Sequence, residues 1–134
     1  MEMNPNEKFV MDFLKMLENR KSSNELEKFY HPDSEQTEFP NTLTKQLTVR
    51  NLQDLKLASE KGANILTKEA YEIMNLYSFE NTVVLECIWK GTLAIALGNL
   101  KSGDQMTAYF AQIFELKDGK IFRQRNYDCF EPFS

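Results

Sequence analysis

The chain has 134 residues, of which 42% are hydrophobic and 27% charged, and its formal net charge is −4 at pH 7. These values predict one globular domain over residues 1–134, with enough apolar residues for a single core. They exclude a typical nucleic-acid surface, which needs clustered Lys and Arg, and no apolar run is long enough to span a membrane. The polar, acidic N-terminus predicts no signal peptide, so we expect a cytoplasmic protein.

Helices are predicted at the start of the chain. Asn4-Pro5 provides a cap followed by a proline in the first turn, and apolar residues then recur at helical spacing to about Arg20. A second, short helix is predicted from Ser23. It ends at His31-Pro32, because proline disfavours helical geometry in the residue that precedes it.

A short extended segment and a third helix come next. Glu35–Phe39 is predicted to be extended and to stop at Pro40. The third helix is predicted over Val49–Lys61, with Thr48 as its N-cap, and Gly62 occupies the place of a C-cap glycine.

The second half of the chain is typical of β-structure. Strands are predicted over Leu66–Leu76, Thr82–Leu97 and Gln105–Leu116. Asp118-Gly119 then supplies the positive φ angles that a two-residue hairpin needs, and it leads into a last strand that ends near Phe130.

This order of elements predicts an α+β fold. Helices grouped early and strands grouped late favour helices packed on one face of a mainly antiparallel sheet. Strands of this length twist, so the sheet is expected to be strongly curved. A curved sheet wrapped around helices encloses a concave pocket, which is where a site is expected.

Metal and redox sites are not indicated. His31 is the only histidine, and Cys87 and Cys129 are far apart on predicted strands with no CxxC pattern. We therefore predict no metal and no cofactor, and we interpret the cysteines as structural thiols. A disulfide between them is possible only if their two strands are neighbours.

Three segments carry a resemblance to a known family. They are Phe29–Pro40, Trp89–Thr92, and Asp118–Ile121 leading to Asn126–Asp128. In their order and spacing the chain, from about Glu7 to Phe133, resembles the SnoaL-like branch of the nuclear transport factor two-like superfamily. That superfamily includes ketosteroid isomerases, polyketide cyclases and limonene epoxide hydrolases.

The resemblance implies a cone-shaped domain with one deep, largely apolar pocket and a homodimer formed through the outer face of the sheet. It implies a small apolar organic ligand and a cofactor-independent isomerase, cyclase or hydrolase that uses a pocket carboxylate. A non-catalytic ligand-binding or protein-interaction domain is the alternative, because this fold hosts many functions.

The short strand contains two candidate carboxylates. Isomerases of the family place their base directly before the proline that closes this strand, and here that position is Phe39. Successive strand residues face opposite sides, so two arrangements are open. If Phe39 faces the pocket, Glu35 joins it; if Glu38 faces the pocket, Gln36 does too. We keep Glu35 and Glu38 as candidate catalytic residues.

The last strand contains the main candidate acid. Phe122, Gln124, Asn126, Asp128 and Phe130 share one face by alternation. Many relatives have Tyr-x-Asp here with the Asp in the pocket, so Asp128 matches the pattern and Asn126 stands in place of the tyrosine. We predict Asp128 as the pocket acid and Asn126 as a ligand-binding residue.

Other residues are weaker candidates. His31 is a candidate acid–base partner near the pocket mouth. Trp89, Tyr71 and Phe39 are candidate pocket-lining aromatics, and Arg50 is a candidate for binding an anionic group of a ligand. Epoxide hydrolases of the family use an Asp-Arg-Asp set, but no Arg between two acids can be placed from the sequence alone.

Overall fold

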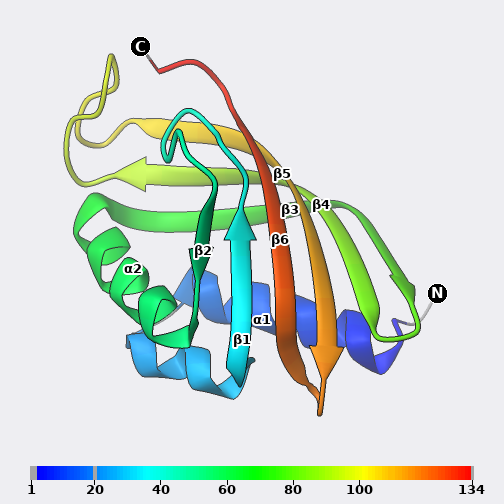
Figure 1. Ribbon diagram of the computed structural model, residues 1–134. Helices are drawn as coiled ribbons and strands as arrows, with labels where there is room; N and C mark the ends of the chain where they lie inside the picture. The colour runs from blue at the N-terminus through cyan, green and yellow to red at the C-terminus, as the bar shows by residue number, and fades with distance from the viewer. Residues whose placement is uncertain (1–2, 20, 134) are drawn as a thin grey trace.

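One six-stranded sheet and two α-helices make up the protein, whose computed structural model describes residues 3–19 and 21–133. In chain order the elements are α1 (Pro5–Asn19), the 3₁₀-helix η1 (Ser23–Lys28), β1 (Tyr30–Glu38), β2 (Thr48–Arg50), α2 (Leu52–Ile65), β3 (Leu66–Phe79), β4 (Thr82–Leu93), β5 (Gln105–Lys117) and β6 (Lys120–Phe130). The strand order is β2-β1-β6-β5-β4-β3 (Figure 1).

The predicted α+β fold is confirmed. All neighbouring strands are antiparallel except β1 and β6, which are parallel. The long strands β3, β4 and β5 bend along their length, so the sheet is curled but does not close (Figure 1). In a mainly antiparallel sheet of this kind, helices can cover one face while the other face is exposed to solvent.

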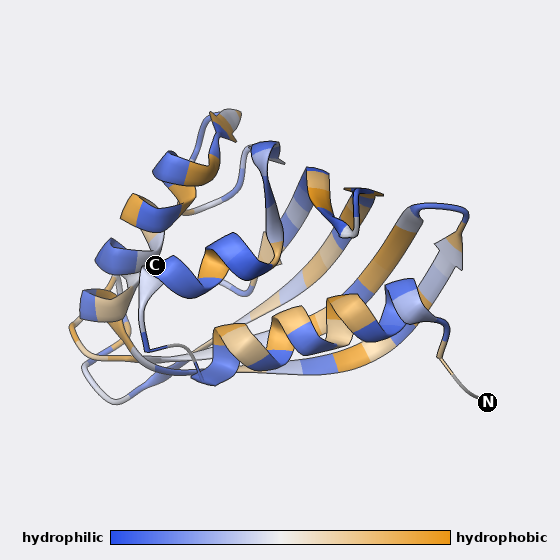
Figure 2. Ribbon diagram, turned by 90° about the horizontal axis from the view of Figure 1, so that it is seen from below, coloured by the Kyte–Doolittle hydropathy of each residue, from blue (hydrophilic) through white to orange (hydrophobic). Residues whose placement is uncertain are grey.

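Helix α1 supplies the core on the inner face of the sheet. Val10, Phe13 and Leu14 recur at helical spacing and are at most 2% exposed. Phe13 packs edge to face on Phe114 of β5, with the ring centroids 5.8 Å apart. Apolar residues form a stripe along α1 where it lies against the strands (Figure 2). Full burial of each such side chain stabilises the fold by about 1.5–3 kcal/mol.

Polar contacts fix α1 at both ends. Asn4 caps the helix by accepting a hydrogen bond from the Glu7 N–H at 2.8 Å. At the other end, the Glu18 carboxylate accepts from the Tyr71 N–H at 2.7 Å. Because β3 lies at the edge of the sheet, this contact also satisfies one of its unpaired backbone donors. The predicted end of this helix at Arg20 lies outside the described residues.

The segment between the first two helices differs from the prediction. β1 begins at Tyr30, five residues before the predicted Glu35, and it contains Pro32. The register with β6 shifts between Tyr30 and Glu35, and this irregularity accommodates the proline. The predicted end of the second helix at His31 was therefore wrong, because pairing with β6 extends the strand.

The start of the third helix also differs. Thr48–Arg50 forms strand β2, antiparallel to β1, so the predicted cap at Thr48 was wrong. Asn51 is the N-cap, and it forms a reciprocal capping box with Asp54. Gly62 lies inside α2, and the helix ends three residues later, at Ile65. The pattern Asn51-x-x-Asp54 could have identified this start from the sequence.

The C-terminal strands follow the prediction closely. Asp118 and Gly119 have φ angles of 53° and 76°, as the predicted two-residue hairpin requires. β4 ends at Leu93, four residues before the predicted Leu97. No helix formed by the described residues is long and apolar enough to cross a membrane.

Candidate functional site

A cavity of about 430 Å³ lies between the curled sheet and α2. Two groups of residues define its character, and we name them by their position. The aromatic wall consists of Tyr71, Trp89, Phe110 and Phe130. The polar wall consists of Tyr30, Gln36, Glu38, Arg50, Gln124, Asn126 and Asp128. The aromatic wall comes mainly from β3, β4 and β5, and the polar wall comes from β1, β2 and β6.

The aromatic wall is closely packed. Trp89 is 6% exposed and stacks on Phe110 with a centroid distance of 5.6 Å and an interplanar angle of 20°. Its indole N–H donates to Glu69 Oε1 at 3.1 Å. A Cβ atom on Gly91 would lie only 2.5 Å from the Trp89 ring, so this position of β4 must lack a side chain.

The polar wall contains a chain of hydrogen bonds between side chains. Gln36 Nε2 donates to the Tyr30 hydroxyl at 3.4 Å, and that hydroxyl donates to Gln124 Oε1. Gln124 Nε2 then donates to Asn126 Oδ1 at 2.8 Å. Burial raises the pKa of Tyr30, so its hydroxyl stays protonated. All four side chains are at most 9% exposed, which makes an unmade hydrogen bond among them costly.

An ion pair lies beside this chain. Arg50 Nη1 donates to Glu38 Oε1 at 2.7 Å and to Gln36 Oε1 at 3.4 Å. The side chains of Arg50 and Glu38 are 20% and 14% exposed, so solvent screens the pair weakly. The second oxygen of Glu38 accepts from Asn41 Nδ2 at 2.7 Å. Glu38 is thus held from both sides.

Asp128 is the exceptional acid of the cavity. Its Oδ1 is buried and has no hydrogen-bond partner among the described residues. Burial, together with the charge of Glu38 and against the opposing charge of Arg50, raises the pKa of its carboxyl group to about 7. A carboxyl group with this pKa exchanges its proton readily at neutral pH, as a general acid or base must.

Six predicted site residues line the cavity: Asp128, Glu38, Asn126, Trp89, Tyr71 and Arg50. The structure also decides between the two arrangements of the short strand, because Gln36 and Glu38 face the cavity. Arg50 lies close enough to Glu38 and Asp128 to influence both acids, a juxtaposition that the sequence alone did not reveal.

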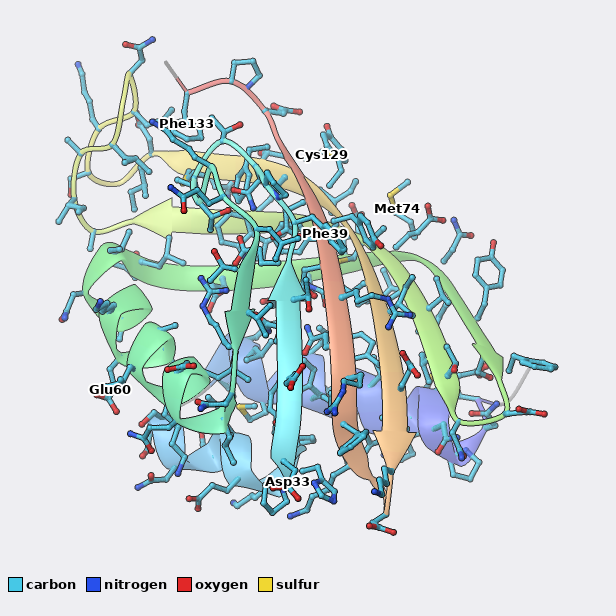
Figure 3. All side chains as sticks on the ribbon, in the orientation of Figure 1. Asp33, Phe39, Glu60, Met74, Cys129 and Phe133 are labelled. Carbon is cyan, nitrogen blue, oxygen red and sulfur yellow. The ribbon has the colours of Figure 1, made fainter. Side chains whose placement is uncertain are left out.

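Three predicted site residues lie outside the lining. Glu35 is exposed on the opposite face of β1. Phe39 packs there too, stacked on Tyr127 with ring centroids 4.5 Å apart. His31 is the second residue of β1, and its Nε2 lies 3.6 Å from Asp118 Oδ2. Figure 3 shows that Asp33, near that end of the strand, lies far from Phe39. The turn of β1 at the bulge and the alternation of the strand separate these residues from the cavity.

Four further residues line the cavity that were not predicted as site residues: Tyr30, Gln112, Gln124 and Glu69. A signal was present for two of them. Gln112 and Gln124 each share a strand face with large apolar residues, where a polar amide is expected to have a specific partner. Tyr30 and Glu69 had no such signal.

The two cysteines are free. Cys87 on β4 is buried, and Cys129 on β6 is exposed. Strand β5 separates β4 from β6. The strands are not neighbours, so the condition for a disulfide is not met. Among the described residues, no group of three His, Cys, Asp or Glu side chains is arranged to hold a metal ion.

Several solved structures have this fold. IdmH of Streptomyces antibioticus, a proposed polyketide cyclase, has a TM-score of 0.77 at 14% identity, covering 94% of this chain and 92% of that one. A nuclear transport factor two-like protein of unknown function from Burkholderia pseudomallei has a TM-score of 0.72 at 13% identity, covering 96% and 92%.

A third similar structure, from Catenulispora acidiphila, has a ketosteroid isomerase-like fold and was solved in complex with trimethylamine. Its TM-score is 0.70 at 11% identity, covering 89% of this chain and 83% of that one. No known protein-family model matches the chain, and no curated protein matches it either. The likeness is therefore one of structure, and the chain has the cone fold of the SnoaL-like and nuclear transport factor two-like proteins.

Proposed function

We propose that the protein binds a small, mostly apolar organic molecule in the cavity and that Asp128 transfers a proton to or from it. The reaction class is that of a cofactor-independent isomerase, cyclase or hydrolase. One observation carries the proposal: a carboxyl group with a pKa of about 7, whose buried Oδ1 has no hydrogen-bond partner among the described residues, lines an aromatic cavity.

The surroundings of Asp128 support this role. At neutral pH a carboxyl group with a pKa of about 7 is present in both protonation states, so it can accept a proton and return it. The aromatic wall offers apolar contact for a ring or chain. A ligand that covers the carboxyl group completes the exclusion of solvent and strengthens local electrostatic interactions.

Glu38 is the less suitable acid of the two. Its Oε1 is paired with Arg50 and its Oε2 with Asn41, at 2.7 Å each. Proton transfer at Glu38 would require that both contacts weaken, whereas Asp128 needs no such rearrangement. The charge of Glu38 instead helps to raise the pKa of Asp128, so its role is indirect.

The proposal is tested by hydrogen–deuterium exchange at the α-carbon of cyclic ketones such as 1-tetralone, dissolved in D₂O with the protein. Asp128 would take the α-proton and return a deuteron, so the only net change is isotopic. We expect the protein to accelerate this exchange and Asp128→Asn to reduce the rate by about 10²–10⁴-fold. Ligand-observed NMR would measure binding separately.

Glu35→Gln is the matched control, because it makes the same carboxylate-to-amide change at an exposed position outside the cavity lining. It should exchange at the wild-type rate. Equal rates for wild type and Asp128→Asn would overturn catalysis by Asp128. Ketone binding without any exchange would leave a ligand-binding protein.

We also propose a homodimer formed through the outer face of the sheet, in the cytoplasm. Tyr109 and Tyr127 are each 43% exposed, on neighbouring strands and on the face away from the cavity. Tyrosine is favoured at protein interfaces. Sedimentation velocity should give a dimer for wild type and a monomer for Tyr127→Arg.

The proposed cytoplasmic location is supported by the free thiol of Cys129, which is exposed and therefore fits a reducing compartment.

A further inference from the structure

The hydrogen-bond chain of the polar wall could run in either of two directions. As observed, Gln36 donates to Tyr30, Tyr30 to Gln124, and Gln124 to Asn126. Turning every amide over and reversing the Tyr30 hydroxyl would give an equally complete chain in the opposite direction. Amide groups and hydroxyls can each donate and accept, so these side chains alone do not choose between the two.

Arg50 decides the direction. Its guanidinium group has five N–H donors and no acceptor, and its Nη1 faces Gln36 Oε1 at 3.4 Å. The carbonyl oxygen of Gln36 must therefore point to Arg50, and its amino group must point to Tyr30. Arg50 is itself held by Glu38 at 2.7 Å, so the end of the chain is anchored.

The direction determines what Asn126 presents to the cavity. Because Asn126 Oδ1 accepts from Gln124 Nε2, the Nδ2 group is left for other partners. No described residue accepts a hydrogen bond from that group, although Asn126 is only 7% exposed and lines the cavity. In the reversed chain, Asn126 would offer a carbonyl oxygen instead. The two directions thus select ligands of opposite hydrogen-bonding character.

We infer that Arg50 is a positioning residue that makes Asn126 a hydrogen-bond donor in the cavity, so the site selects ligands with an acceptor oxygen beside Asp128. The ligand class is an apolar molecule that carries a carbonyl or comparable acceptor. This inference rests on the proposed function, because it assigns a ligand to the same cavity. The protonated Tyr30 hydroxyl transmits the direction set at Arg50 along the chain.

The test compares the Kd values of two probes of nearly the same shape, 1-tetralone and the hydrocarbon tetralin, measured by ligand-observed NMR. The readout is the ratio of the two Kd values, which cancels general changes in the cavity. Asn126→Leu removes the donor, and it should shift the ratio against the ketone by about 3- to 10-fold.

Three further variants test the direction of the chain. Arg50→Lys keeps a group that can only donate, so it should retain the wild-type ratio. Arg50→Met removes that group, and Gln36→Met breaks the chain while keeping the pair between Arg50 and Glu38. Both should shift the ratio in the same direction as Asn126→Leu. Gln36→Met keeps the test decisive if Arg50→Met does not fold.

The outcomes separate this inference from the proposed function. If both probes bind and Asp128→Asn slows exchange, but Asn126→Leu or Gln36→Met leaves the ratio unchanged, the inference is wrong and the proposed function stands. If neither probe binds the wild-type protein, the ligand class is wrong. A shifted ratio with exchange unaffected by Asp128→Asn supports the inference and overturns catalysis.

Discussion

The aromatic and polar walls face each other across one cavity but are held together by different forces. Trp89 and Phe110 stack by burial and dispersion, which are weakly directional and tolerate small shifts. Gln124 and Asn126 depend on hydrogen bonds with fixed directions, and an unmade bond leaves a buried polar group without compensation. The comparison teaches that one wall contributes mainly stability and the other mainly selectivity.

The largest change in stability is expected from the aromatic wall. Trp89→Ala should lower the free energy of unfolding by about 3–5 kcal/mol, because it removes a large side chain that is only 6% exposed. Urea denaturation would measure the change. Tyr77→Ala, at a position 57% exposed on the adjacent strand, should change stability by less than about 0.5 kcal/mol. A loss below that of Tyr77→Ala would show that Trp89 is not a packing residue.

In the polar wall, Asp128→Asn is expected to change stability by less than Trp89→Ala and, at pH 8, to increase it. The pKa of Asp128 is about 7 in the folded protein, against an ordinary value of 3.8, so the folded state binds this proton more tightly. The free energy of unfolding of the wild type should therefore fall as pH rises from 5 to 8, by on the order of 2–3 kcal/mol. Asp128→Asn should remove this contribution and be more stable than the wild type at pH 8.

Chemical denaturation at several pH values would measure this dependence. Glu35→Gln provides the control, since its carboxylate is exposed and should leave the slope as in the wild type. If Asp128→Asn kept the full wild-type decrease in the free energy of unfolding between pH 5 and 8, that decrease would have to come from other groups. A variant that does not fold would give Asp128 a structural role.

Asn41 supports the polar wall from outside the cavity, and its removal gives the third prediction. Asn41 donates to Glu38 and accepts from the N–H groups of Leu43 and Thr44, at 2.8 and 3.0 Å. Asn41→Ala should cost about 1–2 kcal/mol, because it leaves these groups without that partner. Thr42→Ala, at the exposed neighbouring position, is the control. Equal stability of the two variants in thermal unfolding would contradict this role.

The two thiols compare the buried inner side of the sheet with its exposed outer face, and the expected effect is the smallest. Burial raises the pKa of Cys87 to about 12, and Cys129 is exposed on the outer face of β6. In the monomeric Tyr127→Arg variant, whose outer face is open, Ellman's reagent should modify one thiol per folded chain, and adding Cys129→Ser should abolish that reaction with almost no change in stability. Reaction of both thiols in the native protein would mean that the sheet opens near Cys87.

Much of the fold was predictable because it depends on local patterns. The spacing of Val10, Phe13 and Leu14 identified the first helix, and Asp118-Gly119 identified the hairpin. β1 and β2 were harder to predict, because their pairing is with residues distant in the chain. Pro32 was read as the end of a helix, although pairing with β6 across a bulge accommodates it within a strand.

The candidate site was partly predictable for the same reason. Alternation along β6 placed Asn126 and Asp128 on the cavity side. For β1, alternation left two choices, and only the pairing of that strand with β2 and β6 decided that Glu38 faces the cavity while Glu35 does not. Tyr30 joins the site because the early start of β1 brings it next to Gln124.

The sequence by itself determined the helical and strand periodicities, the hairpin and the alternation of β6, since each depends on residues a few positions apart. The tertiary structure alone decided the environment of Asp128. Its raised pKa arises from burial and from the charge of Glu38, which lies ninety positions earlier in the chain. Arg50 likewise acquires its partners only when β2 pairs with β1. Burial and Coulomb interactions depend on distance in space, which local sequence patterns do not contain.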